Sequence, residues 1–148
     1  TEVVTEVVTN VPGKAITSIR LSKANWNHIT LAEIELLDTS GVPISLKDSK
    51  VTSSPIHHSY KWPATRLVDG DTNKFMHTEG AENTWVLIEL ANPVPYANIS
   101  KLRIWNRPDT QFAKQNKGIK VQLFNGTQVL NEWTLGATKR TYEFPLGV

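Results

Sequence analysis

The chain of 148 residues contains 39% apolar and 20% charged residues, a composition typical of a single folded domain and not of a disordered tail. Its formal net charge is only +2 and its basic residues are scattered, which argues against a nucleic-acid-binding protein. The absence of cysteine excludes disulfides, thiolate metal sites and cysteine nucleophiles, and the sequence has no apolar run of about 18 residues that would cross a bilayer.

The first residues differ in pattern from the rest of the chain. They repeat with a period of four (TEVVTEVVT) and then reach Asn10, Pro12 and Gly13. We interpret residues 1–14 as a linker or an edge strand that precedes a domain formed by residues 15–148. The high β propensity of the repeat also supports a second interpretation, in which this segment is a strand that pairs with another chain.

The remainder of the chain has the pattern of β-strands. Apolar and polar residues alternate in SIRLS (18–22), GIKVQLF (118–124) and TYEFPL (141–146), which predicts strands with one buried face. The segment TWVLIEL (84–90) is apolar at nearly every position, which predicts a strand buried on both faces.

Turn signals separate these strands. The pair Asn125 and Gly126 lies between two apolar runs and predicts a β-hairpin, because both residue types tolerate positive φ. We find no convincing amphipathic helix of three turns. Several short strands joined by frequent turns therefore predict an all-β fold, an antiparallel β-sandwich or jelly roll.

Two segments in a fixed order are more informative than any single motif. They are LVDGDTNKFMHT followed by W-x-x-I-E-L, and ISKLRIWNRPD. This succession resembles the galactose-binding-like jelly roll of discoidin (coagulation-factor type C) domains, F-type lectins and the carbohydrate-binding modules of bacterial glycosidases. The resemblance covers roughly residues 16–146. It implies a β-sandwich whose loops at one end of the barrel bind a ligand.

The DGD motif, residues 69–71, is a candidate calcium site. Calcium prefers six to eight hard oxygen ligands, and two carboxylates around a glycine supply some of them. The alternative is an Asx turn closed by local hydrogen bonds. The family resemblance implies a structural calcium ion. Its implied ligands are the Arg66 carbonyl, Asp69, Asp71, Thr78 and Glu143, and Thr72 is an alternative to Thr78.

A second candidate site begins at Arg107. The spacing of Arg107, Asp109 and Lys114 matches the latter part of the F-type lectin sugar motif, R-x-D followed by four residues and R or K. A guanidinium offers several donors in a fixed fork to sugar hydroxyls, and Asp109 would hold it in place. The histidine of that motif would fall near Gly80, so His77 is the nearest candidate. The alternative is an Asp-capped turn with Arg107 as a surface ion-pair partner.

Aromatic and imidazole side chains crowd the segment IHHSYKWP. Trp62 could stack on the apolar face of a pyranose, with His57 and His58 as donors or acceptors at its rim. The alternative places Trp62 in the core, where tryptophans are usually largely buried. A zinc site at the two adjacent histidines is not expected, because neighbouring side chains on an extended segment point to opposite faces.

Together these patterns predict a non-catalytic carbohydrate-binding module with a structural calcium ion and with glycans or glycoproteins as partners. One alternative is a discoidin-type module that binds proteins or membrane surfaces, although membrane binding needs apolar loop tips and few are evident. The other is a purely structural appended domain. No motif positions a nucleophile or a base, so we do not expect an enzyme. The resemblance implies an extracellular, cell-surface or virion-surface location. It is also compatible with the chain being one domain of a larger multidomain protein.

Overall fold

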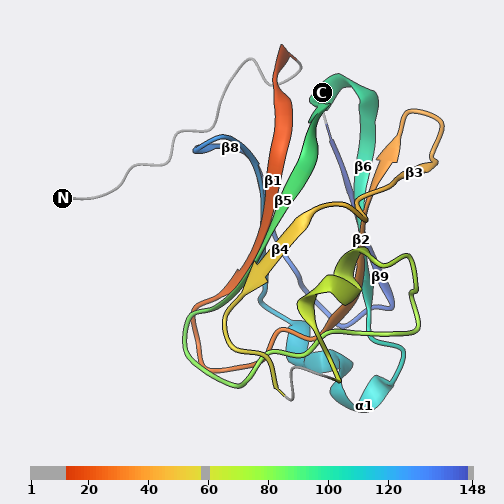
Figure 1. The fold of residues 1–148 in the computed structure, drawn as a ribbon. Helices are drawn as coiled ribbons and strands as arrows, with labels where there is room; N and C mark the ends of the chain where they lie inside the picture. Colours follow the sequence, from red (N-terminus) through yellow and green to blue (C-terminus); the bar gives the residue numbers. More distant parts are fainter. Residues whose placement is uncertain (1–12, 58–60, 147–148) are drawn as a thin grey trace.

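Two antiparallel β-sheets pack face to face in the computed structural model, which describes residues 13–57 and 61–146 (Figure 1). The predicted all-β sandwich is thereby confirmed. The TEVVTEVVT repeat and His58 lie outside the described residues. Among the residues that are described, no helix is long and apolar enough to span a membrane.

The larger sheet has five strands. Its spatial order is β4 (Lys50–Ser53), β5 (Thr84–Pro95), β1 (Ala15–Lys23), β7 (Lys120–Asn125) and β8 (Gln128–Thr134). The predicted hairpin is present, because Asn125 pairs with Gln128 across a two-residue loop. In that loop Gly126 takes φ +59°, a conformation that glycine adopts without steric cost.

The smaller sheet has four strands and is joined to short helical turns. Its order is β3 (Pro43–Ile44), β2 (Leu31–Asp38), β6 (Ile99–Asn106) and β9 (Thr141–Pro145). The short helical turns are η2 (Ala64–Val68), η3 (Tyr96–Asn98), α1 (Thr110–Ala113) and η4 (Lys114–Asn116).

The core forms between the sheets, from one face of most strands and from both faces of β2. Ile19 and Leu21 of β1 are fully buried while Arg20 is exposed, and Val121 and Leu123 of β7 are fully buried as well, as alternation predicts. These residues belong to one hydrophobic cluster that spans both sheets. The core thus makes a rigid platform for the loops at its ends.

The prediction that β5 is buried on both faces is wrong. Val86 and Ile88 are fully buried against the core, whereas Trp85 and Leu87 on the opposite face are only half-buried. An antiparallel sheet can leave one face in water, and no second layer packs over this one among the described residues.

Long loops gather at one end of the sandwich. In Figure 1, α1 lies at the lower end of the sandwich, and the yellow-green turn η2 lies above it, beside β2. The loop after β1, the segment between β4 and β5 and the loop after β6 all supply side chains to this end.

Candidate functional site

The loops at this end enclose a cavity of about 400 Å³. Four of its lining residues were predicted from the sequence as ligand-binding, and the other four were not. The lining residues are His28, His57, Trp62, Phe75, His77, Arg107, Phe112 and Gln115. A cavity of this size with aromatic walls and a few polar groups has the character of a small-ligand site.

Arg107 is buried and held from several sides. Its side chain is 7% exposed, and its Nε and Nη2 donate to the two carboxylate oxygens of Asp109, the latter over 2.8 Å. Nη1 donates to Oγ1 of Thr30 over 2.9 Å. The guanidinium carbon lies 3.8 Å from the ring centroid of Phe75 and 5.1 Å from that of Phe112. The predicted Arg107–Asp109 bond is therefore present, and the arginine is not a loose surface ion-pair partner.

The guanidinium keeps donor capacity toward the cavity. It has five N–H groups, and the bonds to Asp109 and Thr30 use three of them. One N–H on Nη1 and one on Nη2 remain for a ligand that enters the cavity. Lys114 is exposed and does not line the cavity, so the structure does not bring it to Arg107 as the motif implied.

A buried amide network fixes the loop that carries Arg107. Asn116 is fully buried, and it accepts from the backbone N–H of Thr30 and donates to the Thr30 carbonyl and to Oδ1 of Asn106. Oδ1 of Asn106 also accepts from the backbone N–H of Arg107. Because each of these polar groups is paired, the loop after β6 is tied to the start of β2 and holds the guanidinium in one place.

Two histidines share one carbonyl at the cavity wall. Nδ1 of His28 lies 3.0 Å from the Thr78 carbonyl oxygen, and Nδ1 of His77 lies 2.7 Å from it. A carbonyl only accepts, so each Nδ1 carries the hydrogen, and in the neutral form of His77 this leaves Nε2 as an acceptor. Burial lowers the pKa of His77, and the nearby His28 and Arg107 act in the same direction. The cavity therefore offers an acceptor as well as donors.

His28 was not predicted as a site residue, and a backbone ladder explains its place. Asn27 and Ala81 exchange two backbone hydrogen bonds of 3.1 and 3.2 Å, and the N–H of Thr78 donates to the Ile29 carbonyl. This pairing brings a loop far away in the sequence against His77. Gly80 is the position nearest to the motif histidine, and a side chain there would meet Trp26 and His28. No local pattern in the sequence signals such a long-range contact.

Trp62 is half-buried and lies on the cavity wall. Its ring stacks on that of His57 at a centroid distance of 5.5 Å and an interplanar angle of 8°. The backbone N–H of His77 donates to the Trp62 carbonyl, and the N–H of His57 donates to the His77 carbonyl. Trp62 is therefore neither a core residue nor a free loop tip, and its position suits a stacking wall.

The DGD loop shows the local bonds of the alternative interpretation. The N–H of Asp71 donates to Oδ1 of Asp69 over 2.9 Å, and the N–H of Asn73 donates to Oδ1 of Asp71 over 2.9 Å. These are Asx turns. Nη1 of Arg66 donates to the Phe75 carbonyl, which ties η2 to the end of the same loop.

Two of the other expected calcium ligands, Thr78 and Glu143, make hydrogen bonds of their own. Thr78 is fully buried, and its Oγ1 accepts from the N–H of Ile29 beside the cavity. Glu143 on β9 is exposed, and its pKa is lowered by the bond that Lys101 donates over 2.6 Å. Among the described residues, no hydrogen bond or ion pair joins either one to Asp69, and no group of three or more His, Asp or Glu side chains is arranged to hold a metal ion.

Glu33 on β2 is the carboxylate that meets the DGD loop. Its side chain is buried, at 5% exposure, and Oε2 accepts from the N–H of Gly70 over 2.9 Å. Oε1 is buried without a hydrogen-bond partner. Burial, followed by the nearby Asp69 carboxylate, raises the pKa of Glu33 to about 8. This role could not be predicted from the sequence, because Glu33 lies in an ordinary strand pattern.

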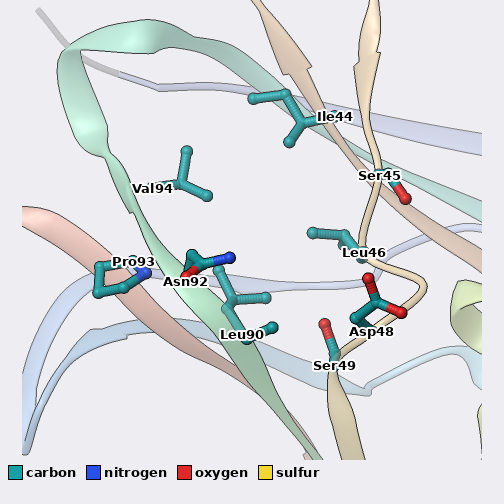
Figure 2. A pocket seen from close by; sticks show the side chains of 10 residues that line it. Ile44, Ser45, Leu46, Asp48, Ser49, Leu90, Asn92, Pro93 and Val94 are labelled. Atoms are coloured by element: carbon teal, nitrogen blue, oxygen red, sulfur yellow. The ribbon is translucent and has the colours of Figure 1, made fainter.

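A second cavity is lined by a different set of residues. It has about 220 Å³ and lies between the segment that joins β3 to β4 and the end of β5 (Figure 2). Ile44, Leu46, Leu90 and Val94 point into it, and Asp48 is its one charged lining residue. It contains none of the residues that the sequence predicted for a ligand or a metal.

No family model matches the chain, and neither the curated proteins nor the solved structures contain a significant match to it. The discoidin-like resemblance therefore stays a prediction from the two motifs, and the geometry of the Arg107 cavity is the basis for assigning a function.

Proposed function

We propose that this protein is a non-catalytic carbohydrate-binding module whose ligand enters the Arg107 cavity. The observation that carries the proposal is the combination of a preorganised, buried guanidinium with aromatic and imidazole walls in one cavity of about 400 Å³. A pyranose has an apolar face and a rim of hydroxyls, and this cavity offers a partner for each.

The hydrogen-bonding groups match a hydroxyl better than they match a carboxylate. Arg107 supplies donors, and Nε2 of His77, whose pKa burial lowers, supplies an acceptor. A hydroxyl can accept from one group while it donates to the other, whereas a carboxylate can only accept. Trp62 and Phe112 provide ring surface around these polar groups.

Binding at a single shallow site of this kind is weak. We expect dissociation constants from micromolar to millimolar, about 4 to 8 kcal/mol of binding free energy, with useful avidity from repeated domains. A glycan array with immobilised protein tests the proposal, and the Arg107→Lys variant tests the site. Binding that survives this substitution unchanged would place the ligand elsewhere.

We further propose that a calcium ion supports the site from the DGD loop. Glu33 fits such an ion because its buried Oε1 has no hydrogen-bond partner and the Asp69 carboxylate is close enough to raise its pKa. A divalent cation would neutralise both carboxylates, and backbone carbonyls of the loop would complete an oxygen set. Its chemistry would be structural, since the loop leads directly to Phe75 under the guanidinium. The melting temperature of metal-stripped protein, with and without added calcium, tests this.

A second candidate function is attachment to a membrane surface. Trp26 and Phe112 are 63% and 40% exposed near the cavity, and exposed apolar residues at loop tips favour such attachment. Sedimentation with anionic liposomes separates this function from sugar binding.

A further inference from the structure

Trp26 is the most exposed of the large apolar side chains among the described residues, and yet it is held in place. Its side chain is 63% exposed. Its ring meets the edge of the His28 ring at a centroid distance of 5.4 Å and an interplanar angle of 73°. An exposed aromatic ring that is held in one position offers a preformed apolar face on which a ligand can stack.

Gly80 provides the space that Trp26 occupies. A Cβ added at Gly80 would lie 2.5 Å from Cζ2 of Trp26 and 2.9 Å from Cε1 of His28. The ring therefore packs directly against glycine backbone. The paired backbone bonds between Asn27 and Ala81 fix the two loops in this register. The position of Trp26 is thus set by the same ladder that brings His28 to the cavity.

Trp26 lies immediately outside the cavity wall. His28 lines the cavity, and Trp26 is its next ring neighbour on the outer side. A ligand unit that leaves the cavity past His28 would reach the Trp26 ring next. Among the described residues, the other exposed large aromatic ring is Phe112, which itself lines the cavity.

We propose that Trp26 is a second sugar subsite, so that the ligand is an oligosaccharide of at least two pyranose units. This inference rests on the proposed function of the Arg107 cavity. The first unit occupies the cavity, and the apolar face of the next unit stacks on Trp26. Stacking on one exposed aromatic ring adds about a tenfold gain in affinity for the longer ligand.

The test compares a monosaccharide with a disaccharide or trisaccharide that carries it, both chosen from the array, by titration calorimetry. Wild-type protein binds the longer ligand about tenfold more tightly. Trp26→Ala removes that gain and leaves the affinity for the monosaccharide unchanged. Val42→Ala, which truncates another exposed apolar residue, is the matched control and keeps the gain.

The outcomes separate this inference from the function on which it rests. If wild-type protein binds no monosaccharide and no longer glycan, both fail. If it binds both ligands and Trp26→Ala keeps the full gain for the longer one, only the second subsite fails. Equal losses for both ligands would place Trp26 in the primary site and overturn the inference. Loss of vesicle sedimentation in Trp26→Ala, with sugar binding intact, would assign the residue to a membrane contact and overturn it as well.

Discussion

Replacing Glu33 with glutamine tests whether this carboxyl, beside the DGD loop, binds a proton or a cation. Glu33 is buried beside Asp69, and its pKa is raised to about 8 from an ordinary value of 4.5. In the absence of metal, the folded protein therefore keeps a proton on Glu33 at a pH where the unfolded chain has released it. Glutamine is the neutral isostere of the protonated carboxyl. It carries no negative charge that a bound cation could neutralise.

The magnitude follows from the two pKa values. Below pH 4.5 the carboxyl is protonated in both states and contributes no pH dependence. As the pH rises from 4.5 to about 8 the unfolded state is increasingly favoured, so stability falls. Between about pH 5.5 and pH 8 the loss is of the order of 3 kcal/mol, at about 1.4 kcal/mol per pK unit. For a domain of this size that corresponds to roughly 6 to 12 °C in melting temperature.

Thermal melts of metal-stripped protein across this pH range give the result directly. We expect wild type and Glu33→Gln to melt together near pH 4, below the unfolded-state pKa of 4.5, and the variant to melt higher near pH 8. Added calcium near pH 8 should raise the melting temperature of wild type and leave Glu33→Gln unchanged. Glu143→Gln is the control, because Glu143 is exposed and pairs with Lys101, so it should respond to calcium as wild type does. Parallel pH profiles for wild type and Glu33→Gln would refute the assignment of Glu33.

Three further predictions concern the cavity and its support. Arg107→Lys should weaken glycan binding at least tenfold, because lysine keeps the charge but cannot make the paired bonds to Asp109. The control is Arg20→Lys on the exposed face of β1, which should leave the affinity in the same titration unchanged. Asn116→Ala should lower the free energy of unfolding in chemical denaturation by about 2 to 4 kcal/mol, because it leaves buried groups unpaired. The exposed Asn92→Ala should lower it by under about 0.5 kcal/mol, and equal losses in the two variants would contradict the network. Wild-type protein should not sediment with anionic liposomes at physiological salt, and sedimentation there would favour the membrane function.

The sandwich was predictable because alternation acts locally. The period-two pattern around Ile19 and Val121 marks the buried face of each strand without knowledge of its neighbours. The burial of β5 was overestimated for the same reason. A run of apolar residues such as Trp85 and Leu87 reports hydrophobicity, and whether another layer covers that face depends on the rest of the fold.

The candidate site was predictable only where its residues lie close together in the sequence. Arg107 and Asp109 are two positions apart, so their bond could be inferred from spacing. His28 and Glu33 reach the site through contacts with loops about 50 and 37 positions away. Such contacts are set by loop pairing, which leaves no periodic signal in a single sequence.

A two-dimensional ¹H–¹⁵N NMR titration with the best glycan from the array tests the location of the sugar site most directly. The indole N–H signals of the tryptophans report on separate parts of the molecule. We expect the Trp62 signal to shift with ligand concentration, together with that of Trp26 for a longer glycan, because these rings lie on and beside the Arg107 cavity. The signals of Trp105 and Trp133, which contact Glu35 and Phe144 on the sheets, should stay in place. Shifts confined to those sheet residues, or to residues around Leu46 and Leu90, would contradict a sugar site at Arg107.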